Sequence, residues 1–129
     1  MPIYVFSYNR GKYLNNLLKS LRLCAAGYDV VIVDDNSDDQ YTLSVIEKWK
    51  DKFSVLTVED SADIRLGGLY NNMRLAFKDA NSRKAVYAMF IQDDMQFTRE
   101  ILDSDLANFE KIFDLSLSAL PFLCFIPAQ

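Results

Sequence analysis

The sequence has no histidine, only two cysteines and no run of Lys or Arg among its 129 residues. Without histidine, Ser-His-Asp catalysis, Cys-His catalysis and imidazole-bound zinc are excluded. Cys24 and Cys124 lie far apart, match no metal-ligand spacing and occur in apolar stretches, so we expect two buried, reduced thiols. The expected location is therefore the cytoplasm, and attachment to the inner face of the membrane stays open.

Glycine and positive charge are also scarce. Only four glycines occur, so the glycine-rich first turn of a Rossmann dehydrogenase and the P-loop pattern are both absent. The formal net charge of −4 and the sequence pI of about 4.7 argue against a nucleic-acid partner. No apolar stretch is long enough to span a bilayer, and the first residues predict a strand rather than a secretory signal.

The composition, half hydrophobic and a quarter charged, predicts a single globular domain over residues 1–129. Apolar runs alternate with segments of helical periodicity, and this alternation predicts an α/β fold. We expect a mainly parallel, Rossmann-like sheet with helices on both faces. The expected strands lie at residues 3–6, 30–33, 53–58, 85–91 and 122–126. The expected core positions of the helices include Leu14, Leu17, Leu18, Leu21, Leu43, Ile46, Trp49, Leu69, Met73, Ala76, Phe77, Leu102, Leu106, Phe109 and Phe113.

Polar residues follow each of the first four expected strands. Ligands of open parallel sheets bind beyond the carboxyl ends of the strands, so we expect these residues to line one site. In chain order, they are Ser7, Tyr8, Asn9 and Arg10, then Asp34 and Asp35, then Arg65 with Gly67 and Gly68, then Asp93 and Asp94.

Asp93 and Asp94 are adjacent carboxylates at the end of an apolar strand. Their mutual repulsion favours a bound cation, and Mg²⁺ or Mn²⁺ prefers oxygen ligands and can bridge to phosphates. Neighbours in an extended chain point to opposite faces, so only one of the pair can face the metal, and we assign Asp94. The alternative is a strand end followed by a helix cap.

Asp34, Asp35 and Arg65 each have two interpretations. Either aspartate could accept a hydrogen bond from a nucleobase or a ribose, but Asp-Asn-Ser-Asp is also good turn and helix-cap chemistry. Arg65 could bind phosphate, or could be solvated before a flexible turn. Similarly, Tyr8 could stack on a base or pack against the sheet.

Four segments, residues 3–10, 33–39, 65–72 and 92–94, together resemble the nucleotide-binding half of a family 2 glycosyltransferase with the GT-A fold. The resemblance covers about residues 2–100, and it rests on the order and spacing of the segments. It implies that Asp94 binds Mn²⁺ or Mg²⁺ on the diphosphate of the donor. The residues implied to bind the donor nucleotide are Ser7, Tyr8, Asn9, Arg10, Asp34, Asp35, Arg65 and Asp93.

The resemblance implies transfer of a sugar from a nucleotide-diphosphate donor, a UDP-sugar foremost, to an acceptor hydroxyl, with inversion of the anomeric centre. It also implies a truncated domain, because the acceptor half and the catalytic base of this family lie in a later segment. A module that binds a nucleotide or nucleotide-sugar without turnover is the alternative. The acceptor is not indicated, and the apolar last strand is expected to leave an edge open for self-association.

Overall fold

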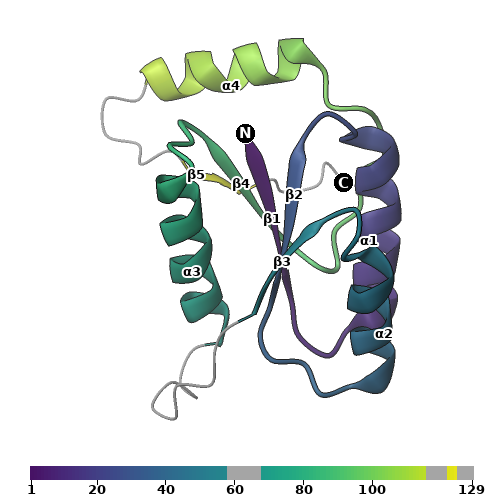
Figure 1. Cartoon of the computed structure of the whole chain (residues 1–129). Helices are drawn as coiled ribbons and strands as arrows, with labels where there is room; N and C mark the ends of the chain where they lie inside the picture. Colours follow the sequence, from purple (N-terminus) through teal and green to yellow (C-terminus); the bar gives the residue numbers. More distant parts are fainter. Residues whose placement is uncertain (58–67, 116–121, 125–129) are drawn as a thin grey trace.

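The computed structural model describes residues 1–57, 68–115 and 122–124, which form a five-stranded sheet with helices packed around it (Figure 1). All strand pairs are parallel and the strand order is β3-β2-β1-β4-β5, which confirms the predicted α/β class. The elements are β1 Pro2–Ser7, α1 Gly11–Cys24, β2 Asp29–Asp34, α2 Gln40–Trp49, β3 Ser54–Thr57, α3 Gly68–Ser82, β4 Ala88–Gln92, α4 Asp103–Leu115 and β5 Phe122–Cys124.

β1 is the centre of the sheet, between β2 and β4, and all six of its residues are buried. A strand covered on both faces needs apolar side chains in both directions, which explains its uninterrupted hydrophobic sequence. The register aligns Ser7 with Asp34 and Phe6 with Gln92. The carboxyl ends of β1, β2 and β4 therefore meet at one edge of the sheet.

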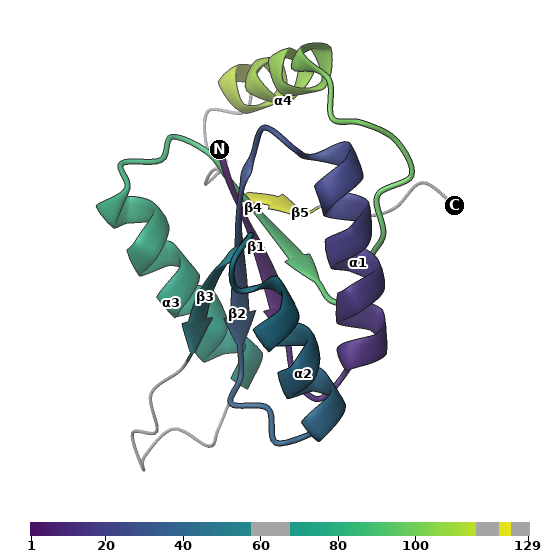
Figure 2. The same cartoon turned by 45° about the vertical axis from the view of Figure 1, so that its right-hand side comes forward.

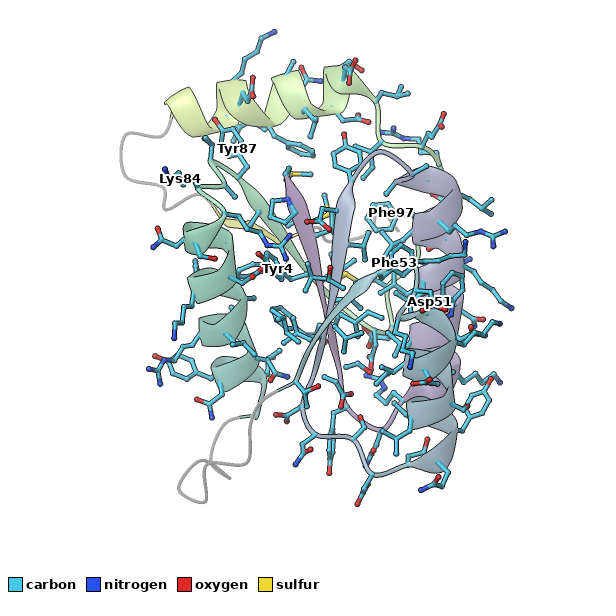
Figure 3. All side chains as sticks on the ribbon, in the orientation of Figure 1. Tyr4, Asp51, Phe53, Lys84, Tyr87 and Phe97 are labelled. Carbon is cyan, nitrogen blue, oxygen red and sulfur yellow. The ribbon has the colours of Figure 1, made fainter. Side chains whose placement is uncertain are left out.

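Helices cover both faces of the sheet, as Figure 2 shows: α1 and α2 lie on one side and α3 on the other. Leu14, Leu17, Leu18 and Leu21 of α1 are fully buried, as their spacing predicts. On the opposite face Tyr4 points toward α3, and its hydroxyl donates to Asp79 at 2.8 Å (Figure 3). Buried apolar clusters thus lie on both faces of the sheet.

The inner faces of α2 and α3 differ from the prediction. Leu43 and Phe77, expected in the core, are exposed, and Thr42 and Asn72 are buried instead. Thr42 can be buried because its hydroxyl makes hydrogen bonds. A pattern of apolar residues does not take such bonds into account and therefore does not predict its burial. In α3, Ala76 is buried against the sheet, as its position predicts.

Further expected core positions, in α3 and before α4, also differ from the prediction. Leu69 and Leu102 are also exposed, and the side chain of Phe113 lies outside the described part. Cys24 is a free thiol that is partly rather than fully buried. No helix among residues 1–57 and 68–115 is both long and apolar enough to cross a bilayer.

α4 lies across the end of the sheet where β1 begins, opposite the edge at which the polar segments gather (Figures 1 and 2). The chain leading to it is tied to α1 by the amide of Ile101, which donates to the carbonyl of Cys24 at 2.9 Å. β5 is the last strand in the sheet order and therefore an edge strand, as expected. Pairing of this edge with another chain stays a prediction.

Candidate functional site

The loops that follow β1, β2 and β4 gather at the lower end of the sheet in Figure 1, as predicted for these three segments. Backbone pairing continues past the strand ends: the amide of Asp35 donates to Ser7 at 2.9 Å, and the amide of Asp93 donates to Phe6 at 3.1 Å. The loops after β1, β2 and β4 are thus held side by side. Their side chains form the candidate site.

Arg10 links the two carboxylates that follow β4. Its Nη1 lies 3.2 Å from Asp93 Oδ1, and its Nη2 lies 3.3 Å from Asp94 Oδ2. The guanidinium also stacks over the ring of Tyr13, 4.7 Å from the centroid. A cationic group therefore already balances the repulsion between the adjacent carboxylates.

The two carboxylates differ in their surroundings. The Asp93 side chain is only 4% exposed, whereas that of Asp94 is 43% exposed, as expected for neighbours that point in different directions. Burial raises the pKa of Asp93, the charge of Arg10 opposes that rise, and the charge of Asp94 adds to it. Asp94 is thus the member of the pair that a solvated cation can reach.

Asp34 and Asp35 also have separate environments. Asp34 is buried, and it accepts hydrogen bonds from the amide and the hydroxyl of Ser37, at 2.8 and 2.6 Å. This is the turn chemistry that its sequence context allows. Asp35 lies on the α3 side, where a Cβ added to Gly68 would overlap its carboxylate. Burial, and then the charge of Asp34, raises the pKa of Asp35.

Asn9 joins the loop after β1 to the loop after β2. Its Oδ1 accepts from the amides of Asp38 and Asp39, at 2.9 and 3.0 Å, and its Nδ2 donates to Asp38 Oδ1 at 2.6 Å. Its own amide donates to the Ser37 hydroxyl at 2.9 Å, and its φ of 49° is one that Asn tolerates better than most residues. The side chain predicted to bind nucleotide therefore has a positioning role here.

Asn9→Ala is expected to lower the free energy of unfolding by about 1–2 kcal/mol, because three side-chain hydrogen bonds are lost and alanine fits a positive φ poorly. Urea unfolding followed by circular dichroism measures the change. The matched control is Asn16→Ala at an exposed position of α1, where stability should be unchanged or slightly higher. An equal response of the two variants would show that Asn9 does not hold the loops.

A second set of contacts ties the start of α2 to the start of α1. Asp39 is the N-cap of α2, as the segment 36–39 predicts, and its Oδ2 accepts from the amide and the hydroxyl of Thr42, each at 2.7 Å. The Thr42 hydroxyl in turn accepts from the amide of Gly11 at 2.8 Å. The Thr42 hydroxyl bond, and then the Thr42 amide bond, lowers the pKa of Asp39 below its ordinary value of 3.8.

Because the pKa of Asp39 is lowered by folding, its ionised form stabilises the protein at pH values above the unfolded pKa. This contribution is lost as the pH falls through the lower, folded pKa. The stability difference between the wild type and Asp39→Asn should therefore be largest near neutrality and shrink from about pH 5 towards pH 3. Urea midpoints of both proteins across this range test it, and a difference that does not change with pH would contradict it.

The remaining predicted residues are Ser7, Tyr8 and Arg65. Tyr8 is exposed at the site, whereas Ser7 is buried and its hydroxyl has no hydrogen-bond partner among the described residues. Arg65 lies outside the described residues. Sequence reasoning missed Thr42 and Asn72, both buried; the signal available was a polar residue on the inner helical face.

The donor set can be tested for its fit to a divalent cation. Within residues 1–57, 68–115 and 122–124, no three Asp, Glu or Cys side chains come close enough to make a complete metal site. Mg²⁺ is commonly held by one or two carboxylates, with substrate phosphates supplying further oxygens. The partly exposed Asp94 fits that pattern, and a cationic group already lies beside it.

Known proteins are similar to this chain in sequence and in fold. The family model described as glycosyl transferase family 2 matches residues 3–115. Poly(ribitol-phosphate) beta-N-acetylglucosaminyltransferase TarS from Staphylococcus aureus strains Mu50 and MW2 is 31% identical over 110 residues, which are 83% of this chain and 18% of TarS. The chain therefore spans about a fifth of the length of these curated relatives.

Two solved structures of TarS are similar in fold to this chain. The crystal structure of S. aureus TarS 1–349 superimposes with a TM-score of 0.64 at 29% identity, covering 86% of this chain and 32% of that one. The same protein in complex with UDP gives a TM-score of 0.62 at 29% identity and the same coverage. The likeness confirms the GT-A-type fold that the motifs predict. By the extent of the family match and the identity to TarS, this chain belongs to glycosyl transferase family 2.

Proposed function

We propose that this chain is the donor-binding half of a metal-dependent, inverting glycosyltransferase, and that its donor is a UDP-sugar. The observation that carries the proposal is the buried Asp93 and exposed Asp94 pair, at the edge where β1, β2 and β4 end. A solved structure of TarS contains UDP, which supports UDP as the nucleotide.

Each part of the site has a role in this proposal. Asp94 would hold Mn²⁺ or Mg²⁺, which when bound supplies Lewis-acid stabilisation of the departing diphosphate. Asp93, next to Arg10, would accept a hydrogen bond from the ribose, and Asp34 or Asp35 would accept one from the base. The exposed ring of Tyr8 offers a stacking surface for the base.

The proposal is tested by titrating the purified chain with UDP and with GDP, each with and without Mn²⁺, in a calorimeter. We expect UDP to bind, and Mn²⁺ to strengthen the binding. Absence of UDP binding in the presence of Mn²⁺ would refute the proposal.

A second assay, for sugar transfer and for donor hydrolysis with UDP- and GDP-sugars, separates an enzyme from a module that binds without turnover. Binding without turnover would assign this chain to donor binding alone. The acceptor, whether saccharide, lipid or protein, is left to the transfer assay.

A further inference from the structure

Arg10 already lies beside Asp94, where the proposed function places a divalent cation. Its two terminal nitrogens contact one carboxylate each, at 3.2 Å and 3.3 Å. The guanidinium also lies over the ring of Tyr13, 4.7 Å from the centroid. The chain thus carries its own counter-cation at the carboxylate pair.

The two contacts of Arg10 are unequal in environment. The contact with Asp93 involves a carboxylate that is almost wholly buried, and breaking it would leave that charge unbalanced. The contact with Asp94 is open to solvent, so it can be broken at little cost. A divalent cation arriving at Asp94 would therefore displace one contact of Arg10 and leave the other.

We propose that Arg10 competes with the divalent cation for Asp94 and thereby makes metal binding depend on the nucleotide. The proposal rests on the proposed function, because it takes Asp94 as the metal ligand. Without nucleotide, a cation with two positive charges must bind beside a guanidinium that repels it. A diphosphate brings enough negative charge to balance both cations. The nucleotide then raises the affinity for the metal, and the metal raises the affinity for the nucleotide by the same factor.

Arg10 is therefore a positioning residue with an unusual signature: removing it should strengthen metal binding in the absence of nucleotide. The exposed Lys12, two residues further on in the first turn of α1, provides the matched control. No ion pair involves Lys12 within the part of the chain that the structure describes. Lys12→Ala removes the same charge without touching the carboxylate pair.

The experiment measures Mn²⁺ affinity by electron paramagnetic resonance at low ionic strength, first without nucleotide and then with saturating UDP. Arg10→Ala should bind Mn²⁺ alone about tenfold more tightly than the wild type, and Lys12→Ala should stay within about twofold. UDP should improve Mn²⁺ affinity about tenfold less in Arg10→Ala than in the wild type. Arg10→Lys keeps the charge without the forked geometry, and its Mn²⁺ affinity should lie between those of the wild type and Arg10→Ala.

The outcomes separate this inference from the proposed function. If the wild type binds Mn²⁺ and UDP together but Arg10→Ala binds Mn²⁺ alone no more tightly, the inference is overturned and the metal assignment stands. A purely structural role of Arg10 would weaken Mn²⁺ binding under both conditions, which also overturns it. If the wild type binds no Mn²⁺ even with UDP, the proposed function fails and the inference fails with it.

Discussion

Replacing Asp94 by alanine is expected to abolish the Mn²⁺-dependent part of UDP binding, with a loss of about a hundredfold or more in affinity for the Mn²⁺–UDP pair. Removing a group that only supports a metal ligand already costs about 10–100-fold in metal affinity, and a direct ligand should cost at least as much. Among the described residues, the other carboxylate beside Arg10 is that of Asp93, and it could replace Asp94 only by giving up its own contact with Arg10. Calorimetric titration of UDP with and without Mn²⁺ measures the loss.

The control for this variant is Asp51→Ala, which removes the same charge beyond the C-terminal end of α2 (Figure 3). Asp94 is partly exposed and makes a single 3.3 Å contact with Arg10, so Asp94→Ala should unfold at the same urea concentration as the wild type. Wild-type Mn²⁺ and UDP binding by Asp94→Ala would show that the metal is held elsewhere. The loss of binding together with a lowered unfolding midpoint would point to a folding defect instead.

Gly11→Ala should have the largest effect on stability, a loss of about 2–3 kcal/mol in the free energy of unfolding. A Cβ at Gly11 would lie 2.7 Å from the Cα of Thr42 and 2.9 Å from its amide nitrogen. Both are backbone atoms of α2, so α1 and α2 would have to separate. The separation would also weaken the 2.8 Å hydrogen bond from the Gly11 amide to the Thr42 hydroxyl. Urea unfolding followed by tryptophan fluorescence is suitable, because the single tryptophan, Trp49, is buried in α2.

Gly27→Ala is the matched control, because a Cβ at that position would meet nothing within 4 Å. Its stability should equal or slightly exceed that of the wild type, since alanine restricts the unfolded chain. Gly11 follows Arg10 directly, so Gly11→Ala should also disturb the carboxylate pair and weaken Mn²⁺–UDP binding. If Gly11→Ala is as stable as Gly27→Ala, then α1 and α2 do not approach each other at Gly11 as closely as the distances above require.

Much of the fold could be predicted because its signals are local. The apolar run of β1 indicates a strand covered on both faces, and the spacing of the leucines in α1 indicates one buried stripe. The same reasoning was wrong for part of the inner faces of α2 and α3, where Leu43 and Phe77 are exposed. There Thr42 is buried through its hydrogen bonds and Asn72 is buried although it is polar, and hydrophobic periodicity indicates neither.

The sequence by itself determined the alternation of strands and helices, and with it the edge at which Asp34 and Asp93 gather, because parallel strands end on the same side. Only the tertiary structure decided which polar side chains meet from one loop to another. Arg10 meets Asp94 across 84 residues, and Asn9 holds the amide of Asp38 across 29 residues. Such contacts depend on which strands are neighbours in the sheet, and that order is absent from any local pattern. For this reason the positioning roles of Asn9 and Arg10 emerge from the fold, although the site that contains them could be predicted.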